Sequence, residues 1–379
     1  MIEIALKMLF GERAKYAILV SGICFATILM TQGLSFFFGI LGFSYATAKN
    51  IRAPIWVVDP LVQSVDENQP LRDTDVNRVR SVEGVAWAVP LYIGGTQAKL
   101  LSGGATYQVT LAGLDADTLA GAPAKLISGN ILDLRLPQSV IVDMAFVERI
   151  QEERGKELRL GDMLEMNDRR AVIVGIAEAA EGQGNGSFVF TTWDRAKEYA
   201  PGQRSMLTHI LAAPAPGWSE ADVTRAITRE TGLKAVSEAQ LKQMSSDSMV
   251  TNSPLPYFVG LLVGVGFVIG LGISGQTFYA FVLENTRHLG ALKAMGASDF
   301  KLAQMIVVQA AIVGFVGFGV GVGVMSGFFS LLPEGRAPLV LLWQIPLIVF
   351  LAVTLICMVA AVVCVWRVSR IEPGIVFRS

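Results

Sequence analysis

Four long stretches without a charged side chain constrain this sequence more than any other feature. Each exceeds the ~20 residues that an α-helix needs to cross ~30 Å of hydrocarbon. Of the 379 residues, 52% are hydrophobic and 17% are charged, with a mean hydropathy of +0.50, which is too apolar for an ordinary soluble protein. We therefore expect four transmembrane helices. The stretches run from Lys15 to Lys49, Asp247 to Glu284, Lys301 to Glu334 and Arg336 to Arg367.

The first stretch could instead belong to a cleaved signal peptide. It is far longer than the 7 to 15 residues of such a core, and no A-x-A-like site precedes a clear break. We expect a retained membrane helix. The preceding segment, 1–15, alternates apolar and charged residues, which suits a helix lying in the cytoplasmic interface or, alternatively, a frayed start of the first span.

The Lys and Arg residues beside the spans predict the orientation. Three precede the first span, three lie between the second and third, and three follow the fourth, whereas the short loop between the third and fourth holds Arg336 alone. This excess places both termini on the cytoplasmic side of the cell inner (plasma) membrane. The nine residues are Lys7, Arg13, Lys15, Arg287, Lys293, Lys301, Arg367, Arg370 and Arg378.

The predicted fold class is a membrane protein with four transmembrane α-helices and an α+β extracytoplasmic domain inserted between helices 1 and 2. Residues 51–250 hold 20 Lys and Arg against 26 Asp and Glu, a net charge of about −6 that disfavours a nucleic-acid surface. The expected order is an interfacial helix (1–15), the first span with a stalk (16–48), the extracytoplasmic domain (51–250), a stalk with the second span (251–283), a cytoplasmic segment (284–301), the third span (302–331), a short extracytoplasmic loop (332–341), the fourth span (342–366) and a cytoplasmic tail (367–379).

Several elements of the extracytoplasmic domain can be placed from periodicity and turn residues. Valines at spacings of three predict a helix over Asp73–Val82. Glycine pairs at 94–95 and 103–104 are expected to separate two strands. A second amphipathic helix is expected to end at Gly232. The remaining predictions are strands at Val85–Ile93 and Thr106–Leu114, a helix at Glu220–Thr231 and a linker at Ser245–Pro256.

The polar island between the second and third spans reads ENTRHLGALKAMGASDFK, from Glu284 to Lys301. It resembles the cytoplasmic segment of FtsX/MacB-type ABC transporter permeases, whose pattern is R-x-x-E-[IL]-G-[IVL]-[LM]-[RK]-A-[LMI]-G-A. In that family the segment reaches a separate ATPase through a short coupling helix. His288 stands where the family often has a carboxylate. The resemblance implies ATPase coupling by Glu284, Arg287, Leu289, Gly290, Leu292, Lys293, Ala294, Met295, Gly296 and Ala297.

Three further stretches carry the same resemblance. Ser139–Ile176, with its Leu160-Gly161-Asp162 turn, is similar to the MacB-type periplasmic domain. Trp366–Arg378, with Ile371-Glu372-Pro373, resembles the ending of these permeases. The phrase WVVDP at 56–60 favours the DevC-like branch.

Glycines recur at spacings of four in the middle spans, notably Gly260 with Gly264 and Gly317 with Gly321. This spacing puts small residues on one helix face and lets helix backbones approach closely. Two roles are open for these four residues, packing at a homodimer interface or packing within one subunit.

Other classes of function are disfavoured. The spans hold no Asp, Glu, Lys, Arg or His, unlike those of ion-coupled carriers. Cys24, Cys357 and Cys364 fall inside the spans, and neither His209 nor His288 has a partner at metal-ligand or catalytic spacing, so we expect no metal site and no catalytic residue. No Walker A sequence occurs in the chain, so ATP and Mg would be bound by a partner ATPase.

The resemblance implies the permease subunit of an ATP-driven ABC exporter that works by mechanotransmission. The implied partners are an ABC ATPase, a second copy of the chain, membrane lipid, a periplasmic membrane-fusion protein and an outer-membrane channel. Two other functions known in related permeases remain open as alternatives. They are regulation of a cell-wall hydrolase, as by FtsX-like proteins, and lipoprotein release. A receptor or anchor without an ATPase is a further alternative.

Overall fold

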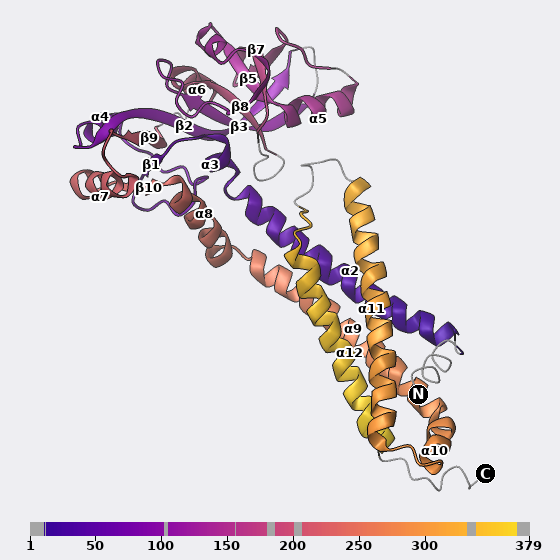
Figure 1. Ribbon diagram of the computed structural model, residues 1–379. Coiled ribbons are helices and arrows are strands. Elements are labelled where there is room, and N and C mark those ends of the chain that lie inside the picture. Colours follow the sequence, from indigo (N-terminus) through magenta and orange to yellow (C-terminus); the bar gives the residue numbers. More distant parts are fainter. Residues whose placement is uncertain are drawn as a thin grey trace. The chain divides into compact units, whose positions relative to one another are not determined.

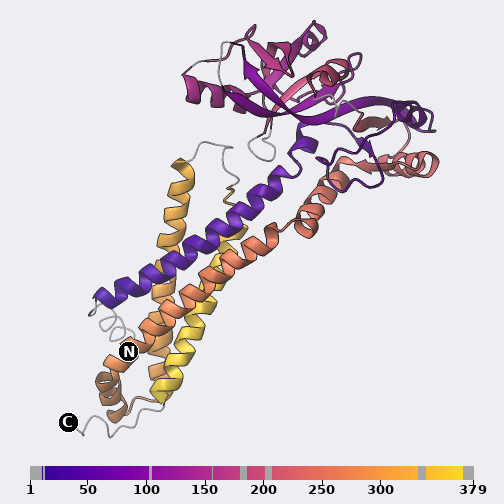
Figure 2. The same cartoon turned by 180° about the vertical axis from the view of Figure 1, so that it is seen from behind.

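The computed structural model describes residue 11 and residues 13–101, 105–155, 157–179, 186–200, 207–331 and 339–369. They form two compact units (Figures 1 and 2). We call them the helical unit, within 1–39, 254–334 and 338–379, and the head unit, within 40–253. The interfacial helix predicted at 1–15 lies outside the described residues except at its end, as does most of the tail predicted at 367–379.

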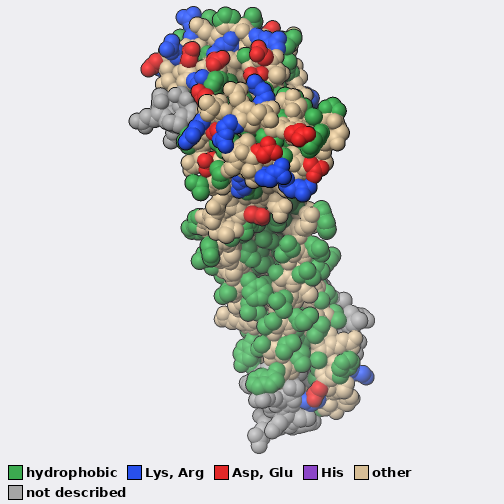
Figure 3. Space-filling view, turned by 90° about the vertical axis from the view of Figure 1, so that its left-hand side faces the viewer, with side chains coloured by type: hydrophobic (Ala, Val, Ile, Leu, Met, Phe, Trp, Pro, Cys, Tyr) green, Lys and Arg blue, Asp and Glu red, His purple; other side chains and the backbone are tan. Residues whose placement is uncertain are grey.

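Among its described residues, the helical unit contains four helices that are long and apolar enough to cross a membrane. On the face seen in Figure 3, hydrophobic side chains predominate along this unit, whereas most of the charged side chains lie on the head unit. A shorter helix, α10 (Thr286–Ala294), joins two of them. The four are α2 (Arg13–Phe43), α9 (Leu255–Glu284), α11 (Asp299–Leu331) and α12 (Gln344–Ser369).

One apolar core holds these four helices together. Each contributes side chains that are almost fully buried, such as Ile23, Phe278, Val313 and Val353. Small residues let the helix axes come close, since a Cβ atom built at Gly270 of α9 would lie 2.7 Å from Ala26 of α2. Such close packing drives helix association where lipid supplies no hydrophobic difference.

The head unit is built on a mixed sheet with ten strands among the described residues, in the order β10-β1-β9-β2-β3-β8-β5-β7-β4. β6 pairs with β2 and β7 beside this path. The pairs β3–β8 and β5–β7 are parallel, and the other pairs are antiparallel. The strands are β1 (Ile55–Val58), β2 (Val85–Leu100), β3 (Thr106–Leu114), β4 (Leu126–Gly129), β5 (Ser139–Asp143), β6 (Met163–Met166), β7 (Arg169–Ala177), β8 (Ser187–Thr192), β9 (His209–Pro214) and β10 (Lys234–Ser237).

Helices cover the sheet and divide the head core into clusters. α4 and α7 pack over the β9 and β2 region through residues such as Val79 and Ile227. α5 and α6 share a cluster with β2, including Phe146 and Tyr199. The helices are α3 (Ala46–Asn50), α4 (Asp75–Arg80), the 3-10 helix η1 (Ile131–Arg135), α5 (Met144–Arg154), α6 (Trp193–Tyr199), α7 (Glu220–Thr231) and α8 (Glu238–Asn252).

A buried carboxylate fixes two of these elements. Asp143 ends β5, and its Oδ1 accepts a hydrogen bond from the Phe146 amide at 2.9 Å, which caps α5. Its Oδ2 accepts from the Phe188 amide of β8 at 2.8 Å. Burial raises the pKa of Asp143 to about 6.

The structure matches some predicted bounds and corrects others. β3 and α7 have the predicted bounds, and Gly232 ends α7 with a φ of +72°. The predicted break at Gly94-Gly95 is wrong, because β2 continues to Leu100 and Tyr92 fills the space where a Cβ of Gly94 would lie.

The segments that join the head unit to α2 and to α9 also differ from prediction. α2 stops at Phe43, and α3 follows as a separate helix. α8 occupies most of the predicted linker at Ser245–Pro256, so the linker prediction is wrong there.

Candidate functional site

The segment between α9 and α11 folds as a short helix closed by a glycine turn. The amide of Gly296 donates to the carbonyl of Lys293 at 3.0 Å, and the amide of Ala297 donates to the carbonyl of Leu292 at 3.0 Å. Gly296 has a φ of +93°, which favours glycine. This is a Schellman motif, which ends a helix by satisfying its last carbonyls. The L-K-A-M-G-A part of the sequence pattern thus contains the residues that end α10.

The apolar residues flanking this turn belong to the helical core. Leu292 and Ala297 pack against the cluster formed by α2, α9, α11 and α12. A contact between these two positions commonly accompanies the Schellman motif. Gly290 is also buried. These three residues therefore hold the segment on the bundle.

The tip of the segment points away from that core. We call residues 294–300 the coupling turn. Its side chains include Met295, which is 76% exposed, and Phe300, which is 80% exposed. Ala294 and Gly296 are exposed as well. The turn thus leaves two large apolar side chains exposed.

Two salt bridges brace the segment. Lys293, in the last turn of α10, pairs with Asp299 in the first turn of α11 at 2.7 Å. Each charge complements the dipole of the helix end that carries it. Lys15 of α2 pairs with Glu284 at the end of α9. α10 lies at the same end of the helical unit as the start of α2 (Figures 1 and 2).

The predicted coupling residues thus divide into groups. Met295, Ala294 and Gly296 are exposed on the coupling turn. Glu284 and Lys293 hold helices together through ion pairs. Arg287 and Leu289 lie in α10, and their side chains lie outside what the structure describes.

The glycines predicted for dimer packing also divide. A Cβ atom at Gly317 would lie 2.8 Å from Ile23, and one at Gly321 would lie 2.7 Å from Thr27, so both face α2 of the same chain. These contacts are those of the alternative, packing within one subunit. Gly260 and Gly264 of α9 have open space at their Cβ positions.

In the head unit, one loop is hydrogen-bonded both to α3, which follows α2, and to α8, which precedes α9. We call residues 59–68 the strap. Thr47 of α3 donates a hydrogen bond to Asp66 at 2.8 Å, and the amide of Val65 donates to Ser245 of α8 at 3.0 Å. Ala48, Ile51 and Leu241 complete a shared buried cluster. α3 and α8 are therefore fixed to each other within the head unit.

Sequence reasoning missed Lys15, Asp299, Phe300 and the strap. Lys15 and Glu284 are far apart in sequence, and nothing in the local pattern links them. Asp299 carried a signal, since an acidic residue in the first turn of a helix is favourable. Phe300 carried none, because its exposure depends on the direction in which α11 leaves the turn.

The histidines have structural surroundings. His209 is fully buried in β9, where its Nδ1 lies 2.9 Å from the Thr208 hydroxyl and its ring meets Trp56 edge to face. Burial lowers its pKa to about 4. His288 is exposed on α10. Within the described part of the chain, no three His, Cys, Asp or Glu residues form a group that could hold a metal ion.

Two family profiles match the chain. The profile described as MacB-like periplasmic core domain matches residues 16–230, and the profile described as FtsX-like permease C-terminal matches residues 260–373. The first match holds α2 and most of the head unit. The second holds α9, α10, α11 and α12, including the coupling turn.

Relatives with assigned names point the same way. Macrolide export ATP-binding/permease protein MacB 2 of Aeromonas hydrophila is 23% identical over 241 residues, 59% of this chain and 36% of that protein. The corresponding MacB protein of Rhodopseudomonas palustris is 21% identical over 69% of this chain and 42% of its own length. The chain thus spans less than half of these two relatives. An uncharacterised ABC transporter permease of Methanocaldococcus jannaschii is 18% identical over 84% of this chain and 81% of its own length.

Two solved structures align with part of this chain. The periplasmic region of MacB from Actinobacillus actinomycetemcomitans aligns with a TM-score of 0.38 and 15% identity, covering 51% of this chain and 92% of that one. The extracellular domain of the noncanonic ABC-type transporter YknZ from Gram-positive bacteria aligns with a TM-score of 0.36 and 13% identity, covering 49% and 100%.

The family profiles account for both units, and the first profile alone covers more than half of the chain. The coupling turn lies within the C-terminal match. The chain therefore belongs to the FtsX/MacB family of ABC transporter permeases.

Proposed function

We propose that this chain is the permease subunit of an ATP-driven ABC exporter and that it transmits the motion of a separate ATPase across the inner membrane. Membership of a permease family supports a transporter subunit without enzymatic activity of its own. The chain contains no Walker A sequence, so the ATP and Mg would be held by the partner.

The coupling turn is the observation that carries this proposal. Its exposed residues, Met295 and Phe300, stand on a turn whose base, Leu292 and Ala297, is packed into the helical core. A partner that pushes the tip therefore pushes α9 and α11 directly. Because Lys15 pairs with Glu284, α2 would move together with α9 and α10.

The proposed path continues along α2 and α9 to the head unit. In this topology both chain termini and the coupling turn are cytoplasmic, and the head unit is extracytoplasmic, as the distribution of Lys and Arg supports. The strap then makes α3 and α8 respond together, because both are bonded to one loop.

A second copy of the chain is proposed to pack against α9. This helix is the least buried of the four candidate spans, with 22% of its most apolar window buried. Its open glycines, Gly260 and Gly264, are flanked by exposed Phe258 and Leu261. Small residues between large apolar ones allow two helices to approach closely.

The direction of transport is proposed from the named relatives. The two MacB proteins are macrolide export proteins by name, which supports export as the activity of this chain. In a cell with two membranes, such an exporter would act with a membrane-fusion protein and an outer-membrane channel. The head unit would make that contact.

Site-specific photocrosslinking tests the proposal. A photoreactive residue in place of Met295 should capture a protein that carries a Walker A sequence, identified by mass spectrometry, and the purified complex should hydrolyse ATP faster than that ATPase alone. The same residue in place of Leu61, which is 76% exposed in the head unit, should not capture it. Equal capture at both positions would contradict the proposal.

A further inference from the structure

We propose that the groove between α11 and α12 binds an acyl chain of an anionic phospholipid, with the lipid headgroup at Lys301. The groove has a volume of about 950 Å³ and lies wholly within the helical unit. The proposal rests on the proposed function only for the orientation, which makes this a lipid of the cytoplasmic leaflet.

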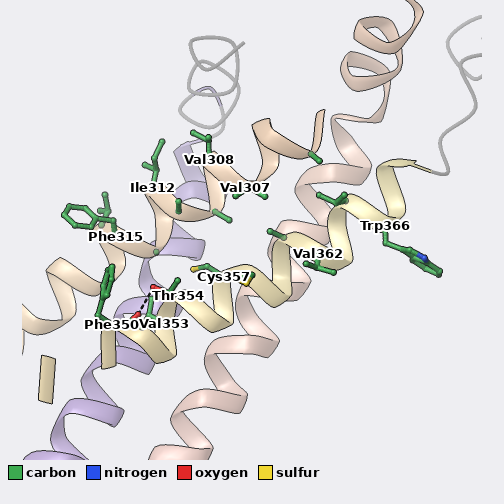
Figure 4. A pocket seen from close by; sticks show the side chains of 18 residues that line it. Val307, Val308, Ile312, Phe315, Phe350, Val353, Thr354, Cys357, Val362 and Trp366 are labelled. Carbon is green, nitrogen blue, oxygen red and sulfur yellow. Dashed lines mark hydrogen bonds between the residues drawn. The ribbon is translucent and has the colours of Figure 1, made fainter. Parts of the chain in front are cut away.

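The chemistry of the lining fits hydrocarbon. Val307 and Phe315 of α11 line the groove together with Phe350 and Val362 of α12 (Figure 4). The lining contains no charged side chain. Its one hydroxyl, that of Thr354, donates a hydrogen bond to the carbonyl of Phe350 at 2.7 Å and therefore offers no unpaired donor.

The groove is long enough to span one leaflet. Its lining runs from Ala303 to Val316 on α11, which at 1.5 Å per residue is about 20 Å. One leaflet of a ~30 Å hydrocarbon core is about 15 Å deep. An acyl chain lying along the helices would therefore fill the groove from the interface to the middle of the bilayer.

Close contacts form the floor and the far end of the groove. A Cβ atom at Gly314 would lie 2.7 Å from the sulfur of Cys357, so α11 and α12 meet there without an intervening side chain. Phe318 meets Phe350 edge to face, with ring centroids 5.2 Å apart. α11 and α12 therefore meet directly at the groove and again just beyond Val316, the last residue of α11 in its lining.

The open end carries the charge that selects an anionic headgroup. Lys301 precedes Val308 by seven residues, about two helical turns, so it stands on the same face of α11 as the groove lining. Lys301 is exposed, and no carboxylate in the described part of the chain pairs with it. Trp366, 57% exposed, lines the same end from α12. A tryptophan with a neighbouring lysine is typical of the lipid headgroup level.

The other possible occupant is a second copy of the chain. An apolar helix from a partner would leave Lys301 without a counter-charge at the interface, whereas a phosphate supplies one. The open glycines of α9 also offer a different face for dimer contact. The charge at the open end therefore favours lipid.

Quenching of Trp366 fluorescence by brominated lipids tests the proposal. The full chain carrying Trp343→Phe would be reconstituted in phosphatidylcholine vesicles that contain a small fraction of acyl-brominated phosphatidylglycerol or, in parallel, of acyl-brominated phosphatidylcholine. Trp366 is then the one remaining tryptophan outside the head unit. One lysine at an anionic surface predicts half-maximal quenching at an about fivefold lower fraction of the brominated phosphatidylglycerol.

Three variants in this background separate the site from general lipid contact. Lys301→Gln should remove the fivefold preference. Val307→Phe, which narrows the groove at a residue that is 52% exposed, should weaken quenching by both lipids. Val320→Phe is the matched control, because Val320 lies on the same helix with 48% exposure and does not line the groove.

The outcomes are distinct. Equal quenching by both lipids, unchanged in Lys301→Gln, would mean contact with bulk lipid only and would overturn the proposal. Protection of Trp366 from both lipids would mean that another protein surface covers the groove, which also overturns it. Equal effects of Val307→Phe and Val320→Phe would do the same. The assay uses neither ATP nor a partner, so failure of the proposed transport function would leave these results unchanged.

Discussion

Lys15, in the first turn of α2, forms a salt bridge with Glu284, the last residue of α9. The bridge joins the start of the first long helix to the residue where the coupling segment begins. Movement of α10 would therefore reach α2 and α9 at the same time. The pair is only partly exposed on the lysine side, which limits its screening by solvent.

The Lys15–Glu284 pair can be tested by exchanging its charges. Lys15→Glu and Glu284→Lys should each reduce stimulation of the partner ATPase, because each places like charges together. The double exchange should restore most of it. Since both side chains are partly exposed, the coupling free energy from a double-mutant cycle should be roughly 0.3–1 kcal/mol. Additive losses would show that the two residues act independently.

The coupling turn predicts different effects for exposed and packed residues. Met295→Glu should abolish ATPase stimulation and leave the melting temperature of the chain unchanged, because the side chain is 76% exposed. Leu292→Ala should lower the melting temperature, because Leu292 packs on the helical core. Leu136→Glu, at a residue that is 52% exposed in the head unit and lies outside the strap, is the control and should change neither measurement. A Met295→Glu complex with normal stimulation would rule out this contact.

The strap makes a prediction for hydrogen exchange. Ser245→Ala removes the acceptor of the Val65 amide, and Thr47→Val removes the donor to Asp66. Losing one hydrogen bond costs about 1 kcal/mol, so exchange of the strap amides should become about fivefold faster. Thr118→Val, which removes a similar bond to Asp115 in another loop, should leave the strap unchanged. Equal exchange in all variants would mean that the strap bonds do not hold the loop.

Asp143 and His209 predict opposite pH dependences of head stability. Burial raises the pKa of Asp143 from 3.8 to about 6, so its contribution to the free energy of unfolding is fully present below pH 3.8 and is lost as the pH rises through 6. Burial lowers the pKa of His209 from 6.5 to about 4, so its contribution is present above pH 6.5 and is lost as the pH falls through 4. Each shift corresponds to about 3 kcal/mol.

Removing either group should therefore expose the pH dependence of the other. In Asp143→Asn, stability should fall more steeply on acidification than in the unchanged chain. In His209→Leu, it should rise on acidification over the same range. Guanidinium unfolding of the full chain in detergent, followed by tryptophan fluorescence, gives both slopes. Parallel slopes in the two variants would contradict the assignment.

Parts of the fold were predictable because local chemistry fixed them. Ser219 caps α7 through the Asp222 amide at 3.1 Å, and Gly232 closes it, so the residues that end the helix are visible in the sequence. β2 was not predictable in full. The Tyr92 ring occupies the space beside Gly94, where a larger residue would not fit. In the sequence, this glycine instead suggests a turn.

The site was predictable as a segment and not residue by residue. The pattern from Leu292 to Ala297 predicted a short helix and the turn that ends it, because the Schellman motif depends on adjacent residues. Which side chains face outward depends on tertiary packing. Gly317 and Gly260 have similar sequence surroundings, yet the first faces α2 and the second faces open space.

The proposed transmission of ATP-driven motion to the head unit can be measured directly as a change of distance. Spin labels attached after the substitution Leu61→Cys, in a chain whose three native cysteines are replaced, would report the distance between two copies in a complex with the ATPase. Double electron–electron resonance should show a change in that distance when ATP and vanadate are added. The Met295→Glu variant should show no change. An unchanged distance in the intact complex, with ATP hydrolysis proceeding normally, would contradict the account.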